Sequence, residues 1–207
     1  MLAIVEIKKT LGVEVQELNV GGGFGIYYNE GDSPLEISEF IEVIMNRLKE
    51  RCTEFDLNMP KVIIEPGRWM VGENGITLYT IGAIKEIKGI RKYVSVDGGM
   101  ADNPRPALYE AEYDATVANK ANNELAEIVT IAGKCCESGD MLIHDIKVPY
   151  IESGDILSVF STGAYNYSMS SNYNRLRKPA VVMIKEGIPR IVVKRETYED
   201  LVRNDLE

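Results

Sequence analysis

The chain has 207 residues, of which 45% are hydrophobic, and a formal net charge of −9. This length and apolar content predict one or two globular domains, and the acidic balance argues against nucleic acid as a partner, since proteins that bind a phosphate backbone carry clustered basic residues. The sequence has no apolar run of membrane-spanning length and no secretory signal at its start, so we expect a cytoplasmic protein with no membrane partner.

The first part of the chain begins with a predicted helix and strand. Residues 2–11 have apolar positions compatible with a helix, and Gly12 follows where such a helix would stop. Residues 13–20 are typical of a strand, which runs directly into the sequence GGGFG at 21–25. Glycine costs more backbone entropy on folding than any other residue, so four glycines in five positions must meet a local need.

A second helix and a second strand are predicted next. Ser33 as N-cap, Pro34 as the first helical residue and Glu36 in a capping box predict the helix start. A stripe of apolar residues at 3–4 spacing follows, consisting of Ile37, Phe40, Ile41, Ile44 and Leu48. Residues 62–64 form an uninterrupted apolar run, which is expected of a parallel strand buried on both faces. Strand, helix and strand together predict a βαβ unit.

Two motifs, GGGFG at 21–25 and EPGR at 65–68, follow the two predicted strands. Ligands gather at the carboxyl ends of strands in such units. Bare backbone N–H groups in a glycine turn make a nest for an anion, most often a phosphate. The dinucleotide pattern GxGxxG fails, because its final position falls on Ile26 or Tyr28. The alternative for the glycines is a tight turn with a purely structural role.

From residue 76 onward the pattern changes to short β-rich runs separated by glycine and charged turns. Their spacing is typical of an antiparallel barrel or sandwich. We therefore place a domain boundary near residues 72–75, and the acidic residues 195–207 predict a terminal helix.

The cysteines and the histidine exclude several chemistries. Cys52, Cys135 and Cys136 are an odd number with two adjacent, which suits neither a disulfide framework nor a zinc site. His144, the single histidine, lies in a strand-like stretch and is interpreted as structural. We therefore expect no metal site and no Ser/His/Asp triad.

Four further motifs occur in order with GGGFG: EPGR at 65–68, RPALY at 105–109, CESGD at 136–140 and GAY at 163–165. As a set they resemble the pyridoxal-phosphate-dependent decarboxylases built from an alanine-racemase-like barrel and a β domain. The resemblance implies the carboxyl-terminal part of a (β/α)8 barrel over residues 1–73 and an antiparallel β-barrel or sandwich domain over 74–207. It also implies a carbon–carbon lyase that uses pyridoxal phosphate, acts on an amino acid, and works as a homodimer with shared active sites.

The resemblance assigns the cofactor to the first part of the chain. Gly22 and Gly23 would hold the cofactor phosphate through backbone N–H groups, and Glu65 would pair with the pyridine nitrogen. The rest of that motif, Pro66, Gly67 and Arg68, would complete the cofactor site. Glu65 could instead be a structural partner of Arg68.

The resemblance also assigns a substrate site. Arg68, Arg105 and Tyr109 would bind the far end of the substrate, since guanidinium groups suit a carboxylate. Tyr165 would contact both the cofactor phosphate and the substrate. The alternatives are a solvated structural arginine for Arg105 and a packed tyrosine with a satisfied hydroxyl for Tyr165.

The resemblance makes Cys136 the candidate catalytic residue, as a proton donor that would act across the dimer interface. Adjacent residues on a strand point to opposite faces, so only one of Cys135 and Cys136 would face the site, and the motif favours Cys136. The alternative is a small buried hydrophobe.

Glu137 would meet a distal ammonium group, and with the arginines it favours diaminopimelate over ornithine, arginine or carboxynorspermidine. Other members of the same family, or a non-catalytic module that dimerises or binds anions, are the alternatives. A complete (β/α)8 barrel takes about 250 residues. The resemblance therefore implies that the lysine that forms a Schiff base with the cofactor, and the histidine that stacks on it, lie outside this sequence. We expect the isolated chain to be inactive.

Overall fold

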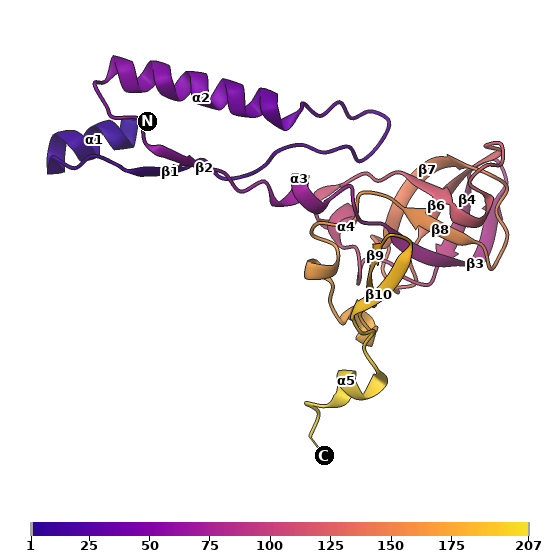
Figure 1. Ribbon diagram of the computed structural model, residues 1–207. Helices are drawn as coiled ribbons and strands as arrows, with labels where there is room; N and C mark the ends of the chain where they lie inside the picture. Colours follow the sequence, from indigo (N-terminus) through magenta and orange to yellow (C-terminus); the bar gives the residue numbers. More distant parts are fainter. Residues whose placement is uncertain (1, 207) are drawn as a thin grey trace. The chain divides into compact units, whose positions relative to one another are not determined.

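The computed structural model describes residues 2–206, and Met1 and Glu207, the outer ends of the two predicted domains, lie outside the described residues (Figure 1). The chain divides into two compact units. The first comprises the residues up to Tyr27 together with Gly31–Met70. The second, called here the sheet unit, comprises Tyr28–Glu30 together with the residues from Val71 onward.

The elements of the first unit are α1 (Leu2–Leu11), β1 (Glu17–Asn19), α2 (Ile37–Glu54), β2 (Lys61–Ile63) and α3 (Gly67–Val71), the last of which ends one residue beyond it. The elements of the sheet unit are β3 (Thr77–Ile87), β4 (Arg91–Val96), α4 (Arg105–Tyr109), β5 (Ala115–Val117), η1 (Ala118–Lys120), β6 (Glu127–Ala132), β7 (Met141–Val148), β8 (Ile156–Val159), η2 (Tyr167–Met169), η3 (Tyr173–Arg175), β9 (Val181–Lys185), β10 (Ile188–Val193) and α5 (Tyr198–Val202).

The predicted strand–helix–strand arrangement of the first unit is confirmed. Strand β1 pairs with β2 in parallel, with Leu18 opposite Val62, and α2 lies between them in the sequence. Helix α1 also has its predicted bounds. It ends at Leu11, and the following Gly12 has a φ of +65°, in the left-handed region that favours glycine.

The predicted start of α2 is wrong by three residues. The helix begins at Ile37, after Glu36 in extended geometry, and not at Pro34. The Glu39 side chain accepts a hydrogen bond from the Glu36 backbone N–H at 3.0 Å, so the capping position lies at Glu36. Ser33 and Pro34 therefore belong to the connection that precedes the helix.

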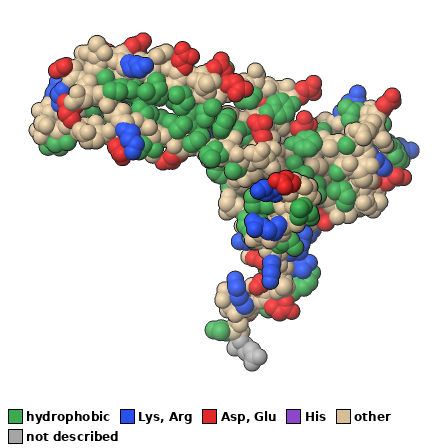
Figure 2. Space-filling view, in the orientation of Figure 1, with side chains coloured by type: hydrophobic (Ala, Val, Ile, Leu, Met, Phe, Trp, Pro, Cys, Tyr) green, Lys and Arg blue, Asp and Glu red, His purple; other side chains and the backbone are tan. Residues whose placement is uncertain are grey.

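Residues 62–64 are half-buried, so the prediction of a strand buried on both faces is wrong for this chain. In the described part of the chain, β1 and β2 form a sheet of two strands, which leaves both faces partly uncovered. Figure 2 shows hydrophobic side chains gathered over the first unit. Its exposed large apolar residues include Leu2, Leu11, Val13, Leu35, Val43 and Met59. Apolar surface of this extent is typical of an interaction surface.

The sheet unit is built on six strands in the order β5-β8-β3-β4-β6-β7. All neighbours are antiparallel except β4 and β6, which pair in parallel with Val94 opposite Ile131. The expectation of a wholly antiparallel sheet is therefore wrong at this pair. The edge strands β5 and β7 approach each other, so the sheet curls into a nearly closed barrel (Figure 1).

The core of the sheet unit lies inside this barrel. Val94, Val117, Val129 and Leu157 are completely buried, and they come from four different strands. Burying a side chain of this size contributes about 1.5–3 kcal/mol. The inward-facing residues of several strands therefore stabilise the barrel and fix the loops at its ends.

Beyond the barrel, β9 and β10 form an antiparallel hairpin. Glu186 and Gly187 make its turn, both at positive φ, which matches the twist of paired strands. Ile184 and Ile188 are 71% and 70% exposed, so the hairpin carries uncovered apolar side chains. The predicted terminal helix is confirmed as α5, whose N-cap Thr197 accepts a hydrogen bond from the Asp200 N–H at 3.2 Å.

Candidate functional site

The glycine turn of the first unit needs glycine at three positions, two of them for their backbone angles. Gly21 and Gly23 have φ values of +77° and +85°. A Cβ at Gly22 would overlap the backbone carbonyl oxygen of Glu65, and the Glu65 N–H donates to the Gly21 carbonyl at 2.8 Å. The turn is therefore packed directly against the chain that follows β2, and Gly22 and Gly23 are exposed.

Asn19, which sequence reasoning missed, joins the two motifs. Its Nδ2 donates to Glu65 Oε1 at 2.5 Å, and its Oδ1 accepts from the Gly21 N–H at 2.8 Å. One amide thus fixes both the start of the glycine turn and the direction of an exposed carboxylate. The signal was a polar residue between two apolar residues, Leu18 and Val20, just before the glycines.

Arg68 lies on α3, the short helix that follows the Glu65–Pro66 step. Its Nε is buried and has no hydrogen-bond partner among the described residues. A buried donor without a partner costs free energy, so this atom marks a place where an anionic ligand would be stabilised. The first unit thus offers a backbone nest, an oriented carboxylate and a guanidinium.

In the sheet unit, Arg105 lies among three tyrosines. Its Nη1 donates to Tyr113 Oη at 2.7 Å and to Tyr28 Oη at 3.0 Å. The guanidinium carbon lies 5.0 Å from the ring centre of Tyr28, 5.7 Å from that of Tyr113 and 5.8 Å from that of Tyr165. The fold therefore holds the guanidinium and does not leave it fully solvated, and both the substrate role and the structural alternative for Arg105 stay predictions. Tyr28 and Tyr113 were missed because they lie outside the recognised motifs.

The structure thus brings two predicted site residues, Arg105 and Tyr165, together. Tyr165 has a φ of +65°, which is unusual for a bulky residue, and its side chain is 48% exposed. The preceding Gly163 donates to the Gly72 carbonyl at 2.9 Å, and it is packed too closely on Val71 for a side chain. The loop therefore holds Tyr165 in a strained conformation with its ring beside the arginine. Tyr109, the last residue of α4, is 64% exposed.

Cys136 and Glu137 lie on the loop between β6 and β7, and both are exposed. The prediction that Cys135 and Cys136 alternate along a strand is wrong, because β6 ends at Ala132 and both cysteines lie in a bend. Their exposure still differs, since Cys135 is half-buried. The exposure of Cys136 removes the alternative of a buried core cysteine.

The two thiols also differ in their electrostatics. Burial, followed by the charge of Asp140, raises the pKa of Cys135 to about 11. Cys135 is therefore held as a neutral thiol at neutral pH, and it is a poor nucleophile.

Tyr173, also missed from the sequence, approaches the Cys136 loop from η3. Its hydroxyl donates to Glu137 Oε2 at 3.4 Å, and partial burial together with the Glu137 charge raises the pKa of the phenol. Glu137, Cys136 and Tyr173 thus form a second group of chemical side chains on the sheet unit.

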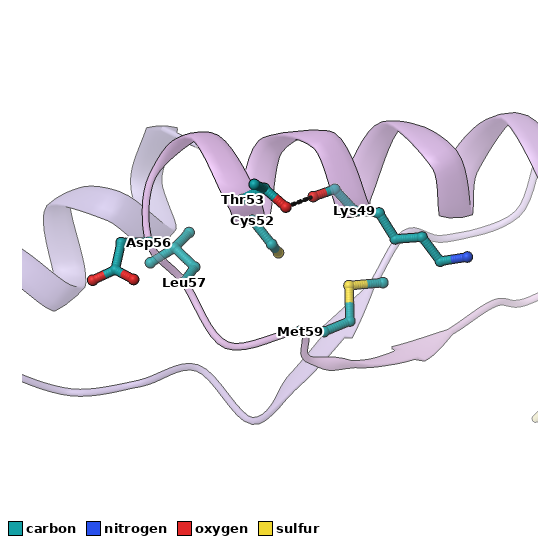
Figure 3. A pocket seen from close by; sticks show the side chains of 6 residues that line it. All are labelled: Lys49, Cys52, Thr53, Asp56, Leu57 and Met59. Carbon is teal, nitrogen blue, oxygen red and sulfur yellow. Dashed lines mark hydrogen bonds between the residues drawn. The ribbon is translucent and has the colours of Figure 1, made fainter.

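A hollow of about 350 Å³ lies at the end of α2. Figure 3 shows its lining, which includes Lys49, Cys52 and Asp56. None of the predicted site residues lines it, and the hydrogen bond drawn there, from Thr53 Oγ1 to the Lys49 carbonyl at 3.0 Å, is internal to the helix. We assign no ligand to this hollow.

Residues 2–206 contain neither a cluster of metal-ligating side chains nor a helix suited to crossing a membrane. Within this range no cluster of three or more His, Cys, Asp or Glu residues could hold a metal ion. Among the same residues, none of the helices combines the length and the apolar character that crossing a membrane requires.

The fold of the sheet unit and its residues define a class of protein. Residues 27–163 match the family described as pyridoxal-dependent decarboxylase, C-terminal sheet domain, and the chain belongs to this family. The cofactor of the family is pyridoxal phosphate.

Within that class, the similar proteins share one name. The chain is 56% identical over 189 residues to the diaminopimelate decarboxylase of Bacillus subtilis, covering 91% of this chain and 43% of the relative. It is 50% identical over 203 residues to the diaminopimelate decarboxylase of Halalkalibacterium halodurans, covering 98% of this chain and 46% of the relative. The crystal structure of diaminopimelate decarboxylase from "m. jannaschii" in complex with L-lysine matches with a TM-score of 0.89 at 34% identity, covering all of this chain and 46% of that one. The chain thus spans less than half the length of these relatives.

Proposed function

We propose that the chain is part of a pyridoxal-phosphate-dependent decarboxylase that converts meso-2,6-diaminopimelate to L-lysine. The observation that carries this proposal is the Glu65 carboxylate held beside the glycine turn by Asn19. A phosphate nest next to an oriented acid is the pairing that the two ends of this cofactor require. The names of the relatives give the substrate.

The first unit would hold the cofactor. Gly22 and Gly23 would bind its phosphate and Glu65 its pyridine nitrogen, while Pro66, Gly67 and Arg68 would complete this side together with Tyr165. The exposed backbone of Gly22 and Gly23, and the buried Arg68 Nε without a partner among the described residues, both fit an anionic ligand. When bound, pyridoxal phosphate supplies an electron sink that accepts the electron pair left as carbon dioxide departs.

The substrate residues would be Arg68, Arg105, Tyr109, Glu137 and Tyr165. Arg105 would bind the distal carboxylate, with its plane fixed by Tyr28 and Tyr113. Glu137 would bind the distal ammonium. Ornithine lacks a distal carboxylate, so an arginine and an acid together favour diaminopimelate.

Cys136 would donate the proton that replaces carbon dioxide on the α-carbon. Its exposure on the β6–β7 loop suits a residue that acts on a site of the partner in a homodimer. The uncovered apolar surfaces of both units support assembly with further protein. The same proposal includes two domains. Residues 1–73 would form the carboxyl-terminal part of a (β/α)8 barrel, and residues 74–207 would form a separate domain. The cytoplasmic location stays a prediction.

The test is a hybrid enzyme in which this chain replaces the matching part of the Bacillus subtilis relative. We expect it to release carbon dioxide and form L-lysine from meso-diaminopimelate. Ornithine and arginine should give much slower turnover. A hybrid that preferred either would instead support a sibling decarboxylase. Cofactor binding without decarboxylation of any of these amino acids would contradict the proposed activity and favour an anion-binding module.

Replacing Asn19 by alanine in the hybrid is expected to weaken cofactor affinity roughly 5- to 30-fold. The change removes hydrogen bonds to Gly21 and Glu65, and a typical hydrogen bond contributes about 1 kcal/mol. Cofactor titration followed by absorbance would measure this. Asn19→Asp keeps the acceptor for the Gly21 N–H but places a second carboxylate beside Glu65. The cofactor affinity of this variant should therefore be lower than that of Asn19→Ala. Equal affinity in all three proteins would show that Asn19 does not orient Glu65.

A further inference from the structure

One buried acid in the sheet unit is not used by the proposed mechanism. Asp140, the last residue of the CESGD motif, is only 3% exposed. Its Oδ2 accepts from the Cys135 N–H at 2.7 Å and its Oδ1 accepts from the Met100 N–H at 2.6 Å. The carboxylate therefore bridges the β6–β7 loop and the loop that follows β4.

The backbone packs closely around this carboxylate. A Cβ at Gly99 or at Gly133 would clash with the carboxyl group of Asp140. Gly99 also has a φ of +153°, at the limit of the region that side chains rarely adopt. Glycine at both positions lets the backbone of two loops close around one acid, and only an acceptor without hydrogens satisfies both N–H groups.

Both loops that Asp140 joins carry predicted site residues. On one side, the Asp140 N–H donates to the Glu137 carbonyl at 3.1 Å, which closes a turn that begins directly after Cys136. On the other side, the Asp102 and Asn103 N–H groups donate to the Gly99 carbonyl, and the chain continues into α4, which begins at Arg105. The side chain is thus the shared anchor of both segments.

A second acid supports the same loop. Asp102 Oδ2 accepts from the Tyr79 hydroxyl at 2.7 Å, and the Gly99 N–H donates to the same carboxylate. Burial raises the pKa of Asp102. The hydrogen bonds from Tyr79 and Gly99 and the charge of Lys134 act in the opposite direction, but burial has the larger effect. The loop after β4 is therefore held between two acids, one of which reaches across to the cysteine loop.

We propose that Asp140 is a positioning residue, which sets the Cys136–Glu137 loop relative to the segment that carries Arg105. This proposal rests on the proposed function for its catalytic meaning. The fixing of the loop itself does not depend on that function, so the two can fail separately. Asp140 acts through backbone groups and contacts neither substrate nor cofactor.

The first test uses the full 207-residue chain and measures alkylation of each cysteine by iodoacetamide and mass spectrometry as a function of pH. In the unchanged chain we expect Cys135 to react with an apparent pKa of about 11, far more slowly at neutral pH than Cys136.

Asp140→Asn removes the charge and places an amide against two N–H donors. We expect the labelling ratio of Cys135 to Cys136 at about pH 8.5 to rise roughly tenfold, because one of the two N–H groups, of Cys135 and Met100, loses the acceptor that joins their loops, and Cys135 becomes more accessible. The matched control is Asp155→Asn, which removes another buried acid of the sheet unit, one bound to Lys120 and Asn119. An equal ratio in Asp140→Asn, Asp155→Asn and the unchanged chain would contradict the proposal.

The second test uses the hybrid enzyme. Asp140→Asn should lower kcat about 10- to 100-fold and also raise KM, since the loop carries both Cys136 and Glu137. A merely structural role would reduce the number of active sites and leave KM unchanged, as we expect for Asp155→Asn. If the unchanged hybrid is inactive, the proposed function fails, while the labelling ratio still decides whether Asp140 fixes the loop.

Discussion

Replacing Cys136 by alanine in the hybrid enzyme is expected to lower kcat roughly 10²- to 10⁴-fold, which is the usual contribution of a positioned proton donor. Cofactor affinity should not change, because this side chain would act only when the α-carbon takes up its proton. Steady-state carbon dioxide release and cofactor titration would measure both quantities. The expectation depends on the exposure of Cys136 on the β6–β7 loop.

The neighbouring thiol provides the matched control. Cys135→Ala removes a side chain of the same size and chemistry from the same bend, but its thiol is half-buried and stays protonated at neutral pH. We expect its kcat to remain within about twofold of the unchanged hybrid. If both alanine variants lost activity equally, the loss would reflect a disturbed loop, and the result would contradict the role of Cys136 as proton donor.

Whether Cys136 serves its own subunit can be tested by mixing two inactive variants. One carries Cys136→Ala and the other Glu65→Ala. If sites are shared in a homodimer, half of the dimers in an equal mixture are mixed, and each has one complete site of two. About a quarter of the unchanged activity should therefore return. No recovery, with mixed dimers demonstrated by native mass spectrometry, would place Cys136 in the site of its own subunit.

Glu137→Gln should lower kcat/KM for diaminopimelate roughly 10- to 150-fold. The change removes the charge that would meet the distal ammonium, and a hydrogen bond to a charged group contributes about 1.5–3 kcal/mol. The amide keeps the shape of the side chain and its contact with Tyr173. Cofactor affinity should be unaffected.

The control for this variant is Glu186→Gln, which makes the same chemical change in the turn between β9 and β10. Its kcat/KM should equal that of the unchanged hybrid. A Glu137→Gln enzyme within twofold of the unchanged one would show that another group binds the distal ammonium.

The local patterns of the sequence predicted much of the fold. Helix α1 and its end before Gly12, the parallel strands around α2, and α5 depend on residues close together in the chain. The start of α2 was misplaced because Ser33 and Glu39 both offer capping groups, and the sequence does not say which is used. The parallel pairing of β4 with β6 joins strands far apart in the sequence, where periodicity carries no information on direction.

The candidate site was predictable where a motif marked it and not where tertiary packing made it. Arg105 and Tyr165 come from motifs, but the tyrosines that fix the guanidinium, Tyr28 and Tyr113, come from separate segments that meet only in the folded sheet unit. Asn19 has a local signal, since it is polar and precedes the glycines. Asp140 lay within a recognised motif, but its role depends on Met100, which no sequence pattern connects to it.

The parallel pairing of β4 with β6 has a consequence for the order of folding. Strands β3 and β4 are neighbours in the chain and can pair early. Strand β6 pairs with β4 from a distant part of the chain, and the intervening residues cross to the opposite edge of the sheet, where β5 pairs with β8. Such distant pairings are slow to form, because the entropy of closing the loop is lost before the contacts are gained. Arg105 lies within that crossing, so we expect its tyrosine surroundings to assemble in the last and slowest step of barrel formation.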